Sequence, residues 1–214
     1  MLADDWNFSP PREDKALVAY GDLNCPFCYA LEERLTRRDV DIHIEWRLVE
    51  HAPELPVLEA DSTEAEQREL TDELAALLTR APDVPISKPP FRPASGPAIR
   101  AVLAAAAVDA LCGDRLRLAL YRALWQEGRN IASSEVIHAV AQECGITAPL
   151  LGSPFAAQAS AWTAEWRASQ FNRIPCLVSS VDARLLGLST EDRLDLFLRS
   201  GLFGSRTEDA CGPS

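Results

Sequence analysis

The amino-acid sequence predicts an α/β fold in which a block of helices interrupts a small β-sheet. Short apolar runs with the character of strands occur only near the two ends of the chain. Apolar residues at the i, i+3, i+4 spacing of amphipathic helices fill the long segment between them. A Cys-x-x-Cys motif lies where the first predicted strand gives way to the first predicted helix. The predicted order is therefore strand, helix, strand, helical block, strand, strand and helix.

The N-terminal part is predicted to contain two strands and a helix. Residues Lys15–Gly21 form a continuous apolar run that ends in glycine, as a buried strand would. Residues Tyr29–Arg38 are apolar on one side and polar on the other, which indicates a helix. From Val40 to Leu48 apolar and polar residues alternate, and this period of two predicts a second strand.

The middle of the chain is predicted to be helical. Residues Thr63–Arg80 open with Thr63 and Glu66 in the spacing of a capping box. Six prolines between Pro82 and Pro97 exclude a continuous helix there and predict a stiff loop. Four further helices are expected, at Ala98–Leu111, Leu116–Gln126, Ser133–Cys144 and Phe155–Gln170.

Strand patterns return near the C-terminus. Residues Cys176–Val181 and Arg184–Leu188 are short apolar runs separated by Asp182-Ala183, which can form a hairpin turn. Thr190 is suited to cap a last helix, because acidic residues follow it in the first turn.

The charge balance limits the classes of partner. The 32 acidic residues outnumber the 21 Lys and Arg, giving a formal charge of −11. Nucleic acids and anionic membranes are therefore not expected partners. The chain has no apolar run long enough to span a membrane and no basic, apolar leader, so we expect a cytoplasmic protein. In a reducing compartment its six cysteines point to catalysis, metal binding or burial rather than to structural disulfides.

The Cys25-Pro26-Phe27-Cys28 stretch predicts thiol-disulfide exchange. Pro26 suits the first position of a helix, which makes Cys25 the N-cap residue. The Cys25 sulfur can then accept the N–H of Cys28 and face the positive end of the helix dipole, which favours the thiolate. Cys28 lies one turn further and can attack a mixed disulfide on Cys25. Phe27 carries no charge, so we expect the helix end to be the main cause of a lowered Cys25 pKa.

Three stretches together resemble a known family. They are NCPFC after the first strand, RIPCLV at Arg173–Val178, and LWQEGRNIASSEVIHAVAQECGI at Leu124–Ile146. With the predicted order of elements, they resemble the DsbA-like branch of the thioredoxin fold, and the last resembles its cytoplasmic FrnE-type members. The resemblance implies a thioredoxin-fold domain at residues 1–61 and 152–214 with an inserted helical subdomain at residues 62–151. It also implies a protein dithiol-disulfide oxidoreductase.

The resemblance assigns further site residues. It implies a cis peptide bond at Pro175 beside the disulfide, and contact of substrate with Ile174, Pro26 and Phe27. Many members bury an acid six residues before the first cysteine, where this sequence has Ala19, and Asp22 is then the nearest replacement. A solvated turn residue is the alternative role of that acid.

The remaining cysteines and histidines are less specific. Cys176 follows the proline on a strand, so its sulfur points either into the core or towards the dithiol as a third thiol. The chain has only three histidines, of which His51 follows a strand end and can approach a cleft. The other single cysteines are expected to pack in the core or to lie in a tail: Cys112, Cys144 and Cys211.

Two other function classes stay open. Glutathione-dependent isomerases and transferases of the hydroxychromene-carboxylate isomerase and kappa types share the inserted fold, but they usually have serine at the place of Cys25. The third class is a redox-silent module that binds zinc or a peptide. For the oxidoreductase we expect no resident cofactor or metal and either a monomer or a homodimer. Its expected partners are thiol or disulfide proteins, small thiols such as glutathione, and a reducing partner.

Overall fold

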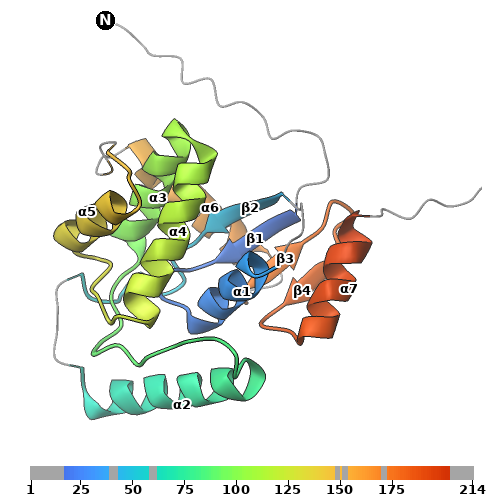
Figure 1. Ribbon diagram of the computed structural model, residues 1–214, viewed down its shortest axis with the longest axis horizontal. Coiled ribbons are helices and arrows are strands. Elements are labelled where there is room, and N and C mark those ends of the chain that lie inside the picture. The colour runs from blue at the N-terminus through green and yellow to red at the C-terminus, as the bar shows by residue number, and fades with distance from the viewer. Residues whose placement is uncertain are drawn as a thin grey trace, which may run out of the picture.

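The computed structural model describes residues 17–38, 43–57, 62–147, 150, 154–169 and 173–202. Within these residues the chain forms four strands and seven helices (Figure 1). The strands are β1 (Leu17–Gly21), β2 (Ile44–Leu48), β3 (Cys176–Val178) and β4 (Arg184–Leu186). The helices are α1 (Pro26–Thr36), α2 (Glu64–Arg80), α3 (Gly96–Val108), α4 (Ala110–Trp125), α5 (Ser134–Glu143), α6 (Pro154–Ala168) and α7 (Glu191–Leu202).

Strands from both ends of the chain form one mixed sheet in the order β2-β1-β3-β4. β1 and β2 are parallel and pair Leu17 with Ile44, whereas β1 and β3 are antiparallel and pair Tyr20 with Cys176. β3 and β4 are also antiparallel. The predicted α/β fold, a thioredoxin-like sheet interrupted by helices, is confirmed.

Helices cover the sheet on both faces, because residues along each strand alternate in direction. Ala19 and Leu177 belong to the main core cluster, which includes residues of α1 and α7. Tyr20 and Cys176 point the other way and form a smaller cluster with Trp166 of α6. Figure 1 shows α1 and α7 in front of the sheet and α6 behind it.

Of the helices between β2 and β3, α2 to α5 lie beside the sheet rather than over it. α3, α4 and α5 form a group at one end, and α2 lies below them (Figure 1). Trp125 at the end of α4 is fully buried and donates a hydrogen bond to the Leu23 carbonyl, which fixes this group to the segment after β1. None of the described helices is long and apolar enough to cross a membrane.

Two predicted boundaries were wrong. The helix predicted at Ala98–Leu111 ends at Val108, and the next begins at Ala110 instead of Leu116. Asp109 separates them, because its side chain accepts the N–H of Leu111 and caps α4.

The C-terminal strands are shorter than predicted, since β3 ends at Val178. The Ser179 hydroxyl accepts N–H groups from the turn, and Asp182 has a positive φ of 60°. The chain therefore turns before Val181 is reached. Val40, Ile42 and the boundaries of the inserted subdomain at residues 61 and 151 lie outside the described residues, so the domain division stays a prediction.

Candidate active site

The two cysteines lie at the N-terminus of α1, directly after β1. Gly21 ends β1, and the chain then turns so that the N–H of Cys25 donates to the Asp22 carbonyl at 3.1 Å. Cys25 has the extended backbone of an N-cap residue, and Pro26 begins the helix as predicted. Both sulfurs are free thiols in this structure, and the residues are buried, with 5% of Cys25 and none of Cys28 exposed.

The environment of Cys25 differs from the prediction. Its sulfur makes no regular capping hydrogen bond, but the backbone N–H of Cys28 still contributes to lowering the Cys25 pKa, as the sequence predicts. The Cys28 thiol is the largest cause of a lowered Cys25 pKa, acting against burial, and the positive charge of His51 lowers it further. The predicted dominance of the helix end is wrong, because the Cys28 thiol and the charge of His51, from another part of the chain, both lower the Cys25 pKa more than the Cys28 backbone N–H does.

Cys28 occupies a closed site behind Cys25. A Cβ atom built on Gly21 would lie 3.4 Å from the Cys28 sulfur, 3.4 Å from the Tyr121 hydroxyl and 2.8 Å from the Trp46 ring. Burial raises the pKa of Cys28 well above its usual value, and the Cys25 sulfur raises it further. The two sulfurs are therefore inequivalent: Cys25 is favoured as the thiolate and Cys28 as the thiol.

Asp22 and His51 form a polar pair beside the dithiol. Asp22 is completely buried, so it is not a solvated turn residue. Its Oδ2 atom accepts the backbone N–H of His51 at 2.8 Å and lies 2.7 Å from His51 Nδ1. His51 was only a weak candidate in the sequence. The position of His51 could have been predicted more strongly: Asp22 follows β1 and His51 follows β2, and residues after two parallel strands lie at the same edge of the sheet.

Pro175 lies at the same edge of the sheet. The Ile174-Pro175 peptide bond is cis, and the Tyr20–Cys176 pairing places Pro175 level with Gly21, where the chain leaves for Cys25. Pro175 is buried and Ile174 is half-buried. Cys176 is fully buried in the cluster on the opposite face of the sheet, so its sulfur points away from the dithiol.

The two residues between the cysteines face different surroundings. Pro26 is buried, whereas Phe27 is half-buried and packs against the core, with the Arg80 guanidinium 5.8 Å from its ring centroid. The substrate contacts expected for Pro26, Phe27 and Ile174 stay predictions.

The proline-rich segment between α2 and α3 lies against the site. The Asn24 side chain donates to the Pro93 carbonyl at 3.2 Å, and the Tyr29 hydroxyl donates to the Pro85 carbonyl at 2.7 Å. The two donors flank the Cys25–Cys28 motif in the sequence. The rigid segment therefore forms one wall beside the dithiol.

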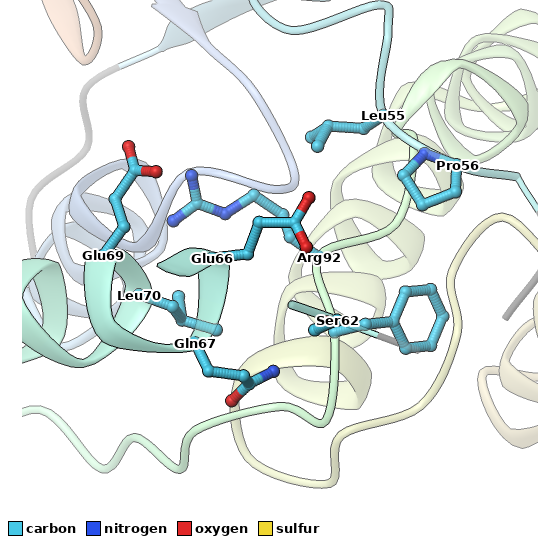
Figure 2. Close-up of a pocket in the computed structure, with 9 residues that line it drawn as sticks. Leu55, Pro56, Ser62, Glu66, Gln67, Glu69, Leu70 and Arg92 are labelled. Atoms are coloured by element: carbon cyan, nitrogen blue, oxygen red, sulfur yellow. The ribbon is translucent and has the colours of Figure 1, made fainter. Parts of the chain in front are cut away.

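A pocket of about 130 Å³ opens between this segment and α2. Figure 2 shows Arg92 between Glu69 of α2 and Leu55 of the loop after β2. Arg92 pairs with Glu73 of α2, and these two charges act on the site, Arg92 on His51 and Glu73 on Cys25. The pocket is lined by Leu55, Pro56, Ser62, Glu66, Gln67, Glu69, Leu70, Phe91 and Arg92.

The structure bears on the metal-binding alternative. In the described part of the chain, no group of three or more His, Cys, Asp or Glu side chains is arranged to hold a metal ion. Cys211 lies outside the described residues.

Comparison with known proteins shows the family and the fold. The family model of the DsbA-like thioredoxin domain matches residues 16–161. No match is found among the curated proteins. Among solved structures, a probable DsbA oxidoreductase from Streptomyces coelicolor is 18% identical, with a TM-score of 0.70 over 94% of this chain and 97% of that one.

Two other solved structures represent different activities. A 2-hydroxychromene-2-carboxylate isomerase is 18% identical, with a TM-score of 0.65 over 86% of this chain and 93% of that one. The cytosolic disulfide reductase DsbM from Pseudomonas aeruginosa, in a structure with GSH, is 22% identical, with a TM-score of 0.60 over 87% and 98%. Identities this low establish a shared fold alone. The match of the domain model to more than half of the sequence shows that the chain belongs to the DsbA-like thioredoxin-domain family.

Proposed function

We propose that the protein is a dithiol-disulfide oxidoreductase that uses Cys25 as its nucleophile and Cys28 as its resolving thiol. The observation that carries this proposal is the inequality of the two sulfurs, since surroundings lower the Cys25 pKa and raise that of Cys28. A nucleophilic thiolate beside a protected thiol is the arrangement that thiol-disulfide exchange requires.

The reaction proceeds by two exchanges. The Cys25 thiolate attacks one sulfur of a substrate disulfide, forms a mixed disulfide and releases the other substrate sulfur as a thiolate. Cys28 then attacks the Cys25 sulfur and expels the second substrate sulfur as a thiolate, which takes up the Cys28 proton and leaves as a thiol, and a Cys25–Cys28 disulfide remains. Two molecules of a small thiol such as glutathione return the pair to the reduced form and leave as their disulfide. The reverse sequence oxidises a substrate dithiol.

The substrates of this proposal are protein or small-molecule disulfides, with glutathione or a reducing protein as the partner. The groups that the chain contributes to the reaction are its own two sulfurs, so the proposal needs no resident cofactor. Similarity in fold to the cytosolic reductase DsbM supports a cytoplasmic location for the proposed enzyme, while its FrnE-type character stays a prediction from residues Leu124–Ile146. The stabilised Cys25 thiolate favours the reduced pair, because a low thiol pKa makes the corresponding disulfide more oxidising.

Equilibration in glutathione buffers tests the proposal. The protein is incubated across a range of reduced to oxidised glutathione, free thiols are trapped by alkylation, and peptide mass spectrometry locates any bridge. We expect one reversible midpoint for a bridge between Cys25 and Cys28, and its potential assigns the direction of the reaction. A Cys112→Ser variant is the matched control, because Cys112 is half-exposed on α4 and should leave the midpoint unchanged.

The remaining outcomes contradict the proposal. Thiols that never pair would exclude the two-sulfur mechanism. A stable glutathione adduct on Cys25 without a bridge would favour the isomerase or transferase class, and stoichiometric zinc in the purified protein would favour the redox-silent class.

A further inference from the structure

The Asp22–His51 pair has no role in the two exchanges described above, and yet it lies beside the nucleophile. Asp22 is the third residue before Cys25 and is completely buried, whereas 26% of the His51 side chain is exposed. A buried carboxylate carries a high free-energy cost unless it is paired and hydrogen-bonded. The geometry around Asp22 shows which groups satisfy it.

Both oxygens of Asp22 hold neighbouring segments. Oδ1 accepts the N–H of Asn24 at 3.3 Å, and Oδ2 accepts the N–H of His51 at 2.8 Å. The Asp22 carbonyl accepts the N–H of Cys25 at 3.1 Å. One residue therefore joins the turn that carries the nucleophile to the loop after β2 that carries the imidazole.

The hydrogen bond from Nδ1 fixes the form of the imidazole. Because an ionised carboxylate only accepts hydrogen bonds, the 2.7 Å contact between Asp22 Oδ2 and His51 Nδ1 places a proton on Nδ1. Nε2 is then the nitrogen that gains or loses a proton. Burial lowers the His51 pKa, but the hydrogen bond and charge of Asp22 and the charge of Cys25 outweigh it, so the net shift is upward.

We propose that His51, oriented by Asp22, is the cation that stabilises the Cys25 thiolate, supplied by the loop after β2 and not from within the Cys-x-x-Cys motif. This inference rests on the proposed function and adds a charged residue and a positioning residue to it. His51 acts on the nucleophile by its charge, and Asp22 acts through His51.

The proton balance of the step is closed within the chain and its substrate. The proton that leaves the Cys25 thiol is balanced by the proton that His51 Nε2 takes up, so the pair becomes a thiolate and an imidazolium. When the thiolate attacks a substrate disulfide, the negative charge leaves on the departing substrate thiolate. The imidazolium returns its proton to that thiolate, so a neutral substrate thiol and a neutral His51 remain.

The other charged groups near the pair largely offset one another. Arg92 opposes protonation of His51, and Glu73 opposes ionisation of Cys25. These two residues form an ion pair with each other, so their fields at the site partly cancel. Cys28 and Tyr121 are further titratable groups near the pair, and burial raises the pKa of each well above its usual value, so both stay neutral.

The pH dependence of Cys25 alkylation tests the inference in a Cys28→Ser background, where Cys25 is the only thiol of the pair. Replacing His51 by asparagine, which keeps a donor towards Asp22 and removes the charge, should raise the midpoint by about one pH unit. Asp22→Asn should shift the midpoint in the same direction.

The matched control is His138→Asn, because His138 is exposed on α5 and its Nδ1 faces the Ser134 carbonyl. This substitution should leave the midpoint unchanged. A His51→Asn protein that is folded by circular dichroism but retains the original midpoint would overturn the inference.

A second measurement needs no substitution and so does not depend on whether a variant folds. If the thiolate and the imidazolium stabilise each other, linkage requires that S-methylation of Cys25 lower the His51 pKa by the same amount. The chain has three histidines, so NMR titration can follow each ring signal. An unchanged His51 pKa would refute the coupling. Failure of the glutathione equilibration with a normal His51 effect would instead remove the proposed function and leave the coupling intact.

Discussion

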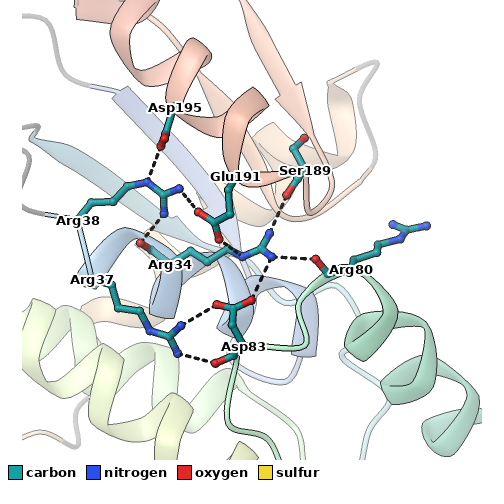
Figure 3. Close-up of polar contacts among 8 residues, drawn as sticks. All are labelled: Arg34, Arg37, Arg38, Arg80, Asp83, Ser189, Glu191 and Asp195. Atoms are coloured by element: carbon teal, nitrogen blue, oxygen red, sulfur yellow. Dashed lines mark hydrogen bonds and ion pairs between the residues drawn. The ribbon is translucent and has the colours of Figure 1, made fainter.

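Replacing Arg34 by alanine should destabilise the protein much more than replacing its neighbour Arg37. Arg34 lies near the end of α1 with only 3% of its side chain exposed. It donates to the carbonyls of Arg80 at the end of α2 and of Ser189 before α7, each at 2.8 Å (Figure 3). It also pairs with Glu191 at 2.5 Å. One guanidinium therefore connects three helices that are distant in sequence.

The contacts give the expected magnitude. Hydrogen bonds from a charged donor contribute about 1.5–3 kcal/mol each, and the lower value applies to a part-buried site, so the two carbonyl bonds give about 3 kcal/mol. The ion pairs add little, because Glu191 and Asp83 are each nearly half exposed. Arg37 is 42% exposed and bonds only to Asp83, so its loss should cost less than about 1 kcal/mol.

Urea unfolding followed by circular dichroism measures both free energies. Arg34→Ala should lower the free energy of unfolding by about 2 kcal/mol more than Arg37→Ala. Alanine at either position is a good helix former, so helix propensity does not explain a difference of this size. Equal effects within about 0.5 kcal/mol would show that the buried guanidinium does not hold the three helices together.

Two further predictions concern the surroundings of the dithiol. Gly21→Ala should lower the free energy of unfolding by about 1–3 kcal/mol, because its Cβ would lie 2.8 Å from the Trp46 ring. If denaturant titration gives the same free energy of unfolding for the variant and the unaltered protein, the Trp46 ring can move aside without cost. In the native protein Cys176 should resist alkylation, since burial raises its pKa to about 12, whereas half-exposed Cys112 should react. Rapid labelling of Cys176 would contradict its burial behind the sheet.

The elements that could be predicted from the sequence are those in which apolar residues recur with a clear period or a local capping motif is present. Alternation in the β2 region and the capping box at Thr63 and Glu66 are local signals, and the capping box is formed as expected. The break between α3 and α4 was missed because the run of alanines before Asp109 gives no contrast between helix faces. Besides the cap at Asp109, a tertiary contact accompanies the break: α3 and α4 pack so closely that a Cβ on Gly113 would lie 2.5 Å from Cβ of Ala106. Such close packing carries no periodic signal.

The same distinction applies to the candidate site. Cys25 and Cys28 could be recognised because the whole motif lies in four consecutive residues. His51 and Arg92 act on the site from segments far away in the sequence, and only the parallel pairing of β1 with β2 brings His51 to the same sheet edge. Ala19 correctly indicated that the usual buried acid was absent. The sequence could name Asp22 as a replacement, but the hydrogen bonds that make it an anchor depend on the fold.

Fold similarity does not separate the two enzyme classes that remain, because an isomerase and a disulfide reductase both share this architecture. The surroundings of Cys28 bear on the choice between them. The absence of a side chain at Gly21 leaves room for the Cys28 sulfur, and the buried Tyr121 hydroxyl lies close to it while donating to the Asp22 carbonyl at 3.2 Å. These neighbours keep Cys28 neutral and inaccessible to solvent, which serves no purpose in a reaction that uses the Cys25 sulfur alone. A protected thiol one helical turn from a nucleophilic thiolate acquires a function only when a mixed disulfide forms on Cys25. The bridge between Cys25 and Cys28 is therefore the observation on which the choice between the two classes depends.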